Sequence, residues 1–376
     1  MNLIQEKSDL PSRYHDVFDE LAALRGRISG PPSVVLHSPE LAHPWNGIGE
    51  FLHRKSIVEP EYAELGVCTA MREFDCAYVW AAHAPAALQA GISQTAVDAI
   101  AGYREPEDLT AGQLDVVRYA RQIAHDRRVE QPLFDALLTS HGPRWLVELT
   151  GWIGRYSALT CILNCFDVEA PPGRPVLPGL KPPVAAPKPV TPPASPRIEL
   201  ITDRKEVDPA GAAIFDAVSA SRGNVRGPFA LLMYSPPLCE AVLGLTVYLR
   251  LDAQIPARTR ELAVIATARE RDCPYVWAAH APAARKEGVS DETIAAVRDG
   301  AALESGSSEG DVVELVRQLM RSHRVEQSRF DRLIAEHSLP GLVELCAVIG
   351  HYLCVTTLLN AFEVAPAEGA EALPLG

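Results

Sequence analysis

The stretch FDCAYVWAAHAPAALQAGIS, residues 74–93, recurs as RDCPYVWAAHAPAARKEGVS at residues 271–290. Residues upstream match at the same offset of 197, and downstream the offset becomes 196, as in RVEQPLFDAL from Arg128 and RVEQSRFDRL from Arg324. The two copies therefore differ by one residue in the loop near 101–112 or in its counterpart. Because solenoid repeats have periods of about 20 to 50 residues, a repeat this long indicates a duplicated domain.

A proline-rich segment, residues 170–198, separates the two copies and begins APPGRPVLPGLKPPVAAPKPV. Proline lacks a backbone donor and fixes φ, so neither helix nor strand propagates through such a segment. We predict a semi-rigid, extended linker of polyproline type; the alternative is a proline-rich ligand for a partner domain. The predicted domains are residues 1–169 and 199–376.

Each copy has the composition and spacing of helices. Ala, Leu, Glu and Arg dominate, apolar residues recur three and four positions apart, and no set of alternating β-branched segments appears. Residues 91–93 and 288–290 are typical of a helix stop followed by an N-cap serine. Residues from about 143 to 166 and from about 340 to 362 each predict one long apolar helix, in the middle of a bundle or at a subunit interface. We therefore predict an all-α protein with two helical-bundle domains.

The overall composition excludes several classes of function. The chain has 376 residues, of which 47% are hydrophobic and 22% charged, and its net charge of −13 argues against binding nucleic acid or anionic membranes. No run of about 18 apolar residues and no secretory signal pattern is found, so we expect no membrane span and a cytoplasmic location. Eight cysteines in such a chain indicate reduced thiols rather than a disulfide framework.

Two of the cysteines lie at predicted helix starts. Asp75 and Asp272 are candidate N-caps, which places Cys76 and Cys273 in the first turn. Pro274 supports this register, because proline is tolerated in a first turn. A thiol at a helix N-terminus lies near the positive end of the helix dipole, so we expect a lowered pKa and an accessible thiolate.

The helical period indicates which of the side chains that recur in both copies share one helix face. At about 100° per residue, Cys, Trp and His share one face and Tyr points elsewhere; these residues are Cys76, Trp80, His83 and Tyr78 in the first copy and Cys273, Trp277, His280 and Tyr275 in the second. Glu64 and Glu261 lie 12 positions before their cysteines, on the preceding predicted helix. A carboxylate, an imidazole and a thiol brought together in this way form a proton relay.

Other interpretations of these residues stay open. A cysteine buried beside a tryptophan, or a histidine satisfied in the interior, would give the same pattern. The remaining cysteines have no cysteine at the matching position of the other copy and are interpreted as small core residues; they are Cys68, Cys161, Cys165, Cys239, Cys346 and Cys354. We expect no metal and no cofactor, because a third and fourth ligand, a glycine-rich phosphate loop and a serine-nucleophile motif are missing.

The pattern of Glu, 12 residues, Cys-x6-His and Gly-[Ile/Val]-Ser resembles the carboxymuconolactone decarboxylase family, which includes the alkylhydroperoxidase AhpD. The resemblance covers nearly all of both copies and implies an AhpD-like helical bundle. AhpD-like members reduce peroxide with a Cys-x-x-Cys-x-x-x-His motif activated by a glutamate. Here Val79 and Val276 occupy the place of the second cysteine. A thiolate oxidised to sulfenic acid would therefore need a resolving thiol from outside the motif.

The Tyr-x-Trp-x-x-His pattern resembles instead the decarboxylase-like branch, whose members act on 4-carboxymuconolactone. This resemblance implies a proton-donating histidine, His83 or His280, tuned by its glutamate. The expected substrate-binding residues are Tyr78, Trp80, Tyr275, Trp277 and Arg260. Because an anionic substrate prefers a nearby arginine, and Arg258 and Arg260 precede Glu261 whereas Glu61 and Ala63 occupy the first copy, we favour the second copy as the active one.

Three functional hypotheses follow. The first is a decarboxylase-like lyase acting on a small cyclic or unsaturated carboxylic acid, the second an AhpD-like thiol peroxidase acting through Cys76 or Cys273, and the third a non-catalytic binding or scaffold protein. The expected partner is a small-molecule substrate, with no nucleic acid and no membrane. The tandem is expected to behave as a built-in dimer, and the family resemblance implies further homo-oligomers of trimeric or hexameric type.

Overall fold

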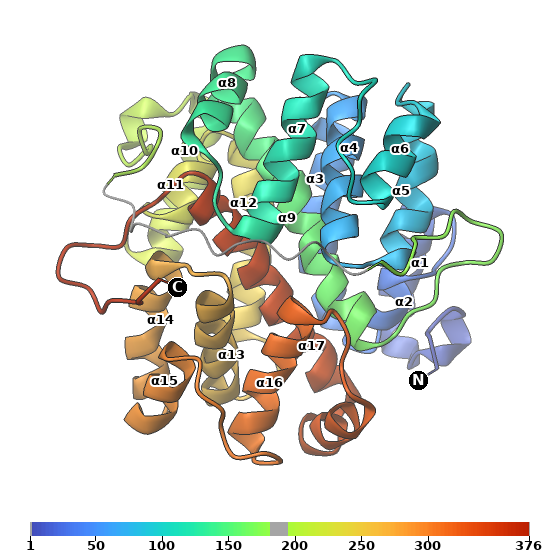
Figure 1. Cartoon of the computed structure of the whole chain (residues 1–376). Coiled ribbons are helices and arrows are strands. Elements are labelled where there is room, and N and C mark those ends of the chain that lie inside the picture. The colour runs from blue at the N-terminus through green and yellow to red at the C-terminus, as the bar shows by residue number, and fades with distance from the viewer. Residues whose placement is uncertain (1, 181–194, 376) are drawn as a thin grey trace.

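The computed structural model describes residues 2–180 and 195–375, and within those ranges it contains helices and no strand (Figure 1). The all-α prediction is confirmed. The centre of the predicted linker, residues 181–194, lies outside the described residues, so its polyproline conformation stays a prediction.

The first half is built from short helices that lead into one long helix. Its α-helices are α1 (His15–Arg25), α2 (Pro31–Val35), α3 (Ala42–Lys55), α4 (Pro60–Glu73), α5 (Ala77–Gln89), α6 (Gln94–Ala101), α7 (Ala111–Arg121), α8 (Gln131–His141) and α9 (Pro143–Cys165). Three short 3-10 turns, η1 (Lys7–Asp9), η2 (Ser12–Tyr14) and η3 (Pro39–Leu41), precede α3, and a π-helical turn, η4 (Gln122–Asp126), extends α7.

The second half repeats this order of helices. It begins with a 3-10 turn, η5 (Arg204–Glu206), and continues with α10 (Pro209–Arg222), α11 (Pro228–Leu232), α12 (Pro236–Leu251), α13 (Ala257–Glu270), α14 (Pro274–Lys286), α15 (Asp291–Arg298), α16 (Ser308–Arg321) and α17 (Gln327–Ala361). Ser338 has a left-handed φ of 67° and divides α17 into two helices, at the position where Gly142 separates α8 from α9.

Local sequence signals explain where several helices end. Gly91 and Gly288 have φ values of +91° and +90°, which a residue without a side chain adopts at no steric cost. The Ser93 hydroxyl then accepts a hydrogen bond from the Ala96 N–H, and the Ser290 hydroxyl accepts one from the Thr293 N–H. The predicted helix stops and N-cap serines are confirmed.

The long helix α9 packs against the second part of α17 in the middle of the molecule, and α3 packs against α12 (Figure 1). The close crossing requires small residues: a Cβ added at Gly154 would lie 2.8 Å from the Cys354 Sγ, and one at Gly350 would lie 2.6 Å from the Ala158 carbonyl oxygen. By length and composition α17 is apolar enough to cross a membrane, but 94% of its most apolar window is buried inside the protein. Core packing therefore accounts for that composition.

Two fully buried carboxylates join the halves reciprocally. Glu344 accepts hydrogen bonds from the Ser38 hydroxyl at 2.6 Å, the Tyr248 hydroxyl at 2.8 Å and the Gln254 N–H at 2.5 Å. Each of its partners lies outside α17, and Ser38 belongs to the other half. A buried carboxylate is tolerated only when such donors replace its water.

Glu148 has the matching arrangement in the opposite direction. It accepts hydrogen bonds from the Ser235 hydroxyl at 2.8 Å, the Ile57 N–H at 2.7 Å and the Arg144 side chain at 2.9 Å. Ser235 belongs to the second half, so each half supplies one serine to the buried glutamate of the other. This exchange fixes how the halves sit against each other.

We predict that Ser38→Ala and Ser235→Ala each lower the free energy of unfolding by about 1 to 3 kcal/mol, because each leaves a buried carboxylate one donor short. Denaturant unfolding measures the loss. Ser12→Ala, at an exposed position, is the control and should change stability by less than about 0.5 kcal/mol. Equal stabilities for all three variants would contradict the proposed role of the exchange.

Candidate active site

The cysteines at the starts of α5 and α14 are themselves the N-cap residues. The helices begin at Ala77 and Pro274, one residue after Cys76 and Cys273. The prediction that Asp75 and Asp272 are the N-caps was wrong by one position, because both residues have a left-handed φ of 47° and belong to the turn before the helix. Pro274 occupies the first helical position, as its tolerance there requires.

Both thiols are buried, and the expected lowering of their pKa was wrong. Burial raises the pKa of Cys76 to about 12, with backbone N–H groups and Arg324 opposing it only in part. Burial likewise raises the pKa of Cys273 to about 11 against the backbone N–H of Val276 and the charge of Arg128. Desolvation outweighs the helix N-terminus. The other six cysteines are buried as predicted.

An imidazole and a carboxylate do come together in each half. The His83 Nδ1 lies 2.7 Å from the Glu64 carboxylate, and the His280 Nδ1 lies 2.7 Å from the Glu261 carboxylate. Neighbouring antiparallel helices, α4 with α5 and α13 with α14, supply the two partners. The structure thus places these glutamates against the histidines, as the spacing suggested, whereas the thiols bond to backbone N–H groups.

Glu261 is held in its ionised form. Burial opposes its ionisation, but the hydrogen bond from His280 and the charges of His280 and Arg260 outweigh burial, so the pKa of Glu261 lies below its usual value. An ionised carboxylate accepts hydrogen bonds and donates none. The His280 Nδ1 therefore carries a proton, and its Nε2 faces the Tyr352 hydroxyl at 3.2 Å.

The first half has the same Glu–His pair with a different tyrosine contact. The Tyr156 ring meets the His83 ring edge-on at 4.4 Å, while the Tyr156 hydroxyl lies 2.7 Å from the His53 Nε2. Tyr156 and Tyr352 occupy matching positions of the repeat, but sequence reasoning gave them no role. Their recurrence in both copies is the sequence signal that could have identified them.

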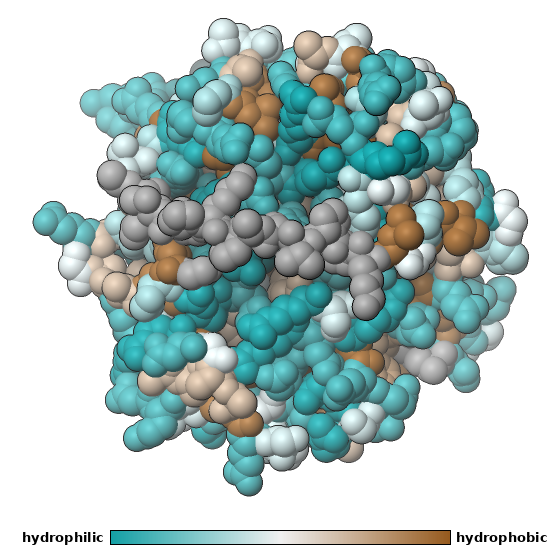
Figure 2. Space-filling view, in the orientation of Figure 1, coloured by the Kyte–Doolittle hydropathy of each residue, from teal (hydrophilic) through white to brown (hydrophobic). Residues whose placement is uncertain are grey.

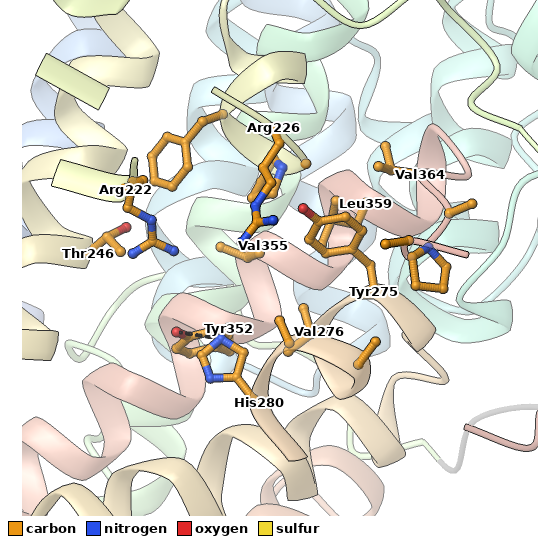
Figure 3. Close-up of a pocket in the computed structure, with 18 of the residues that line it drawn as sticks. Arg222, Arg226, Thr246, Tyr275, Val276, His280, Tyr352, Val355, Leu359 and Val364 are labelled. Carbon is orange, nitrogen blue, oxygen red and sulfur yellow. Dashed lines mark hydrogen bonds between the residues drawn. The ribbon is translucent and has the colours of Figure 1, made fainter. Parts of the chain in front are cut away.

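A cavity of about 450 Å³ opens beside His280 in the second half (Figure 3). Its polar lining comes from Arg222 and Arg226, in and after α10, from Tyr275 and His280 on α14, and from His351 on α17. Apolar side chains that include Val276, Val355, Leu359 and Val364 complete the wall. Figure 3 shows the Arg226 and Tyr275 side chains beside each other, with His280 and Tyr352 joined by their hydrogen bond.

The segment after α17 forms part of the cavity wall. Ala365, Pro366 and Ala367 line the cavity. Further along, the Pro374 carbonyl accepts a hydrogen bond from Arg269, and Glu371 pairs with Arg285 at 3.3 Å. These contacts hold the C-terminal segment across the end of the cavity.

The helical-wheel grouping was wrong for α14. Tyr275 was directed away from His280 by the helical wheel but was also expected to bind substrate, and it lines the same cavity as His280. The cavity follows the helix face of Val276 and Ala279, with Tyr275 and His280 at its two edges. Trp277, expected to bind substrate, lies on the far side of the helix and is fully buried in the core.

The other expected binding residues lie elsewhere. Arg260 lies against Glu261, with a side-chain distance of 3.4 Å, and is not among the residues that line the cavity. Trp80 is buried and lines a different cavity, which Val176 also lines. Arg222, Arg226 and His351 were missed, because their distance from His280 in the sequence gives no local signal.

A glycine leaves space for the hydroxyl group of Tyr275 and another for that of Tyr78. Gly227 has a φ of +56°, and a Cβ at this position would overlap the Tyr275 hydroxyl. Gly30, with a φ of +63°, stands in the same relation to Tyr78. The tyrosine hydroxyl therefore fills the space that any other side chain would need.

Larger side chains occupy part of the matching space in the first half. At the positions of Val242, Thr246 and His351 the first half has Trp45, Gly49 and Arg155. The buried Arg155 guanidinium lies over the Trp45 ring at 4.5 Å. A Cβ at Gly49 would lie 3.7 Å from the Arg155 Nε, at van der Waals contact, so Gly49 packs beside the arginine. Trp45 and Arg155 are thus larger than Val242 and His351, which line the cavity of the second half.

Part of the second half matches a known protein family. Residues 236–319, from α12 into α16, match the carboxymuconolactone decarboxylase family. The second half carries a domain of this family. The match includes Glu261, Cys273 and His280, whereas Arg222, Arg226 and Tyr352 lie outside it. No curated protein matches the chain. The relation of the first half to the same family stays a prediction from the internal repeat.

The site offers no set of metal ligands. Within residues 2–180 and 195–375, no three His, Cys, Asp or Glu side chains gather closely enough to hold a metal ion. The chemistry available in the cavity includes an imidazole backed by a carboxylate, the second imidazole of His351, two guanidinium groups and two phenols.

We predict that Gly227→Ala lowers the free energy of unfolding more than Gly223→Ala does. Both positions have positive φ, but the space around Gly223 is open, so its alanine adds only backbone strain of about 1 to 2 kcal/mol. The overlap with Tyr275 should add about 1 to 3 kcal/mol more. Denaturant unfolding gives both values; equal losses would mean that the Tyr275 position is not constrained by residue 227.

We predict that Cys76 and Cys273 resist alkylation in the folded protein between pH 7 and 9. Because their pKa values are raised to about 12 and about 11, both thiols stay protonated in that range. Peptide mass spectrometry after an iodoacetamide pulse measures the modification, with urea-unfolded protein as the reactive control. Selective modification of these two residues in the folded protein would contradict the assignment of buried, protonated thiols.

Proposed function

We propose that the cavity of the second half is the active site of a decarboxylase-like enzyme that acts on a small cyclic or unsaturated carboxylic acid. One observation carries the proposal: His280, paired with the buried carboxylate of Glu261, opens into the same cavity as Arg222 and Arg226. The family match of residues 236–319 supports it.

The arginines supply the binding energy for an anion. Guanidinium groups stay charged in proteins and match carboxylate geometry with two parallel donors. The chain as a whole is acidic, with a net charge of −13, so attraction of an anionic substrate depends on these local charges. Arg222 and Arg226 hold the part of the substrate that stays anionic, where enolate charge develops.

The apolar wall serves the leaving carboxylate. Val276, Val355 and Leu359 offer it no hydrogen bonds, and a poorly solvated carboxylate is less stable relative to the transition state in which its charge spreads. The carbon–carbon bond to this group breaks, its electron pair enters the conjugated system as an enolate, and carbon dioxide departs.

His280 completes the reaction by protonating carbon. Its Nδ1–H is held by Glu261, so the protonated Nε2 delivers its proton to the carbon that lost carbon dioxide, and a proton from solvent restores the imidazolium. The net change is carboxylate plus one proton to carbon dioxide plus a new C–H bond. Tyr352 orients the Nε2 atom.

The thiol peroxidase alternative is disfavoured by the surroundings of the cysteines. Peroxide reduction needs a thiolate that peroxide can reach. Cys76 and Cys273 are fully buried with raised pKa values, and Cys273 is not among the residues that line the cavity. The proposal therefore rests on the histidine rather than on the thiol.

We predict that His280→Ala lowers decarboxylation about 100-fold to 10,000-fold, the usual contribution of a positioned acid or base. Carbon dioxide release is measured from a panel of unsaturated, 3-oxo and lactone carboxylic acids that includes 4-carboxymuconolactone. His83→Ala is the matched control and should leave the rate unchanged, because the first half has Trp45 and Arg155 where Val242 and His351 line the cavity of the second half. Cys273→Ser should also have a mild effect.

We predict further that Arg226→Gln raises the Kd of a carboxylate ligand by about 10-fold to 100-fold, since a charge-assisted hydrogen bond contributes about 1.5 to 3 kcal/mol. Isothermal titration calorimetry measures the change. Binding without turnover of any acid in the panel would favour a binding protein. Loss of the Cys273 thiol at the rate at which the protein consumes peroxide would restore the peroxidase hypothesis.

A further inference from the structure

The C-terminal segment after α17, residues 364–374, gives the cavity an apolar end. Its side chains that line the cavity are those of Val364, Ala365, Pro366, Ala367 and Ala370. None of these side chains carries a charge or a hydrogen-bonding group. Ala367 is exposed, and Ala365, Pro366 and Ala370 are partly exposed, so they present surface that a bound molecule can cover.

The guanidinium groups lie toward the other end of the cavity. Figure 3 shows Arg222 and Arg226 toward one side of the view and Val364 toward the other. The cavity volume of about 450 Å³ lies within the range of about 300 to 1,000 Å³ that is usual for sites of drug-sized ligands. The cavity thus has room for more than an anionic group bound at the arginines.

The C-terminal segment is anchored in the same way as its counterpart in the first copy, residues 168–178. Arg269 donates a hydrogen bond to the Pro374 carbonyl, and Arg72 donates one to the Pro178 carbonyl at 2.6 Å. The leucine before each proline is buried. These anchors fix the register of the two segments, so their residues can be compared one by one.

The two segments differ at positions that line the cavity. Glu169 and Arg174 stand in the first copy where Ala365 and Ala370 line the cavity of the second. Because a segment with the same anchors carries charged residues at these positions, the fold does not require small apolar side chains there. The alanines accompany the cavity of the second half instead.

We propose that the substrate carries an uncharged alkyl or aryl group that packs against the C-terminal segment, while its carboxylate pairs with Arg222 and Arg226. Its chemical class is then a carboxylic acid with an apolar substituent at the end away from the anionic group. A charge at that end would lose water without gaining a partner. The carboxylate rests on the proposed function, whereas the apolar group rests on the wall of the cavity alone.

Binding of substituted benzoates tests the apolar end. Isothermal titration calorimetry compares benzoate with its 4-methyl, 4-ethyl and 4-propyl derivatives and with terephthalate, which carries a second carboxylate in place of the alkyl group. We expect the Kd to fall about twofold to fourfold with each added carbon, the gain from burying a methylene group. Terephthalate should bind more weakly than 4-methylbenzoate, because its second charge would face the apolar wall.

Substitutions in the C-terminal segment locate the gain. Ala365→Asn and Ala370→Asn should each lower the preference for 4-propylbenzoate over benzoate by about fivefold, because a polar group replaces apolar wall. Ala372→Asn is the matched control, since Ala372 lies in the same segment, is exposed and is not among the residues that line the cavity. It should keep the full preference. Unchanged binding of benzoate shows that each variant retains the cavity.

The 4-alkylbenzamides, which have no charge, distinguish this inference from the proposed function. If they bind as tightly as the benzoates and show the same gain, lost in Ala365→Asn, the carboxylic acid substrate is wrong and the apolar group stands. If benzoates bind more tightly than benzamides but alkyl groups add nothing, the proposed function stands and the inference is overturned. Tighter binding of terephthalate than of 4-methylbenzoate, or a gain that persists in both lining variants or is lost equally in Ala372→Asn, also overturns it.

Discussion

Two carboxylates buried at the centre of the molecule set the constraint on which the rest depends. Glu148 and Glu344 are fully buried, on the two helices that cross in the core, and each takes a hydroxyl donor from the opposite half. Since a buried carboxylate with one donor removed is strongly destabilised, the serines at the starts of η3 and α12 cannot shift without cost. Tyr248 on α12 also donates to Glu344 on α17, so the position of α12 relative to α17 follows from the same need of a buried carboxylate for donors.

The cavity depends on that position. Val242 and Thr246 lie on α12 and His351 on α17, so the depth of the cavity is set by how these two helices meet. The corresponding pair in the first half, α3 and α9, meets in the same way, yet there the Arg155 guanidinium lies over the Trp45 ring. One frame thus carries larger side chains, Trp45 and Arg155, at two positions that line the ligand-sized space of the second half.

The periodic part of this arrangement could be predicted from the sequence, and the part that depends on distance in three dimensions could not. Helix boundaries and the approach of Glu261 to His280 follow from local spacing on neighbouring helices. Tyr275 was expected to bind substrate, although the helical wheel directed it away from His280, because a wheel gives a direction but not the location of the open space. Tyr275 reaches the cavity since Gly227 leaves room for its hydroxyl. Arg222 and His351 come from elements far apart in the chain.

The contrast between thiol and imidazole shows why burial favours one chemistry over another. A thiolate must be generated by losing a proton, and burial raises the pKa of Cys273 because backbone N–H groups and the charges of Arg128 and Arg271 replace the lost water only in part. His280 needs no isolated charge, because a neutral imidazole can bond to an ionised Glu261 and a protonated one forms an ion pair with it. The same desolvation that keeps the Cys273 thiol protonated also strengthens the electrostatic attraction between Glu261 and His280. A protein that keeps its cysteines in the core and its Glu–His pair at a cavity wall is therefore better suited to moving protons than to reducing peroxides.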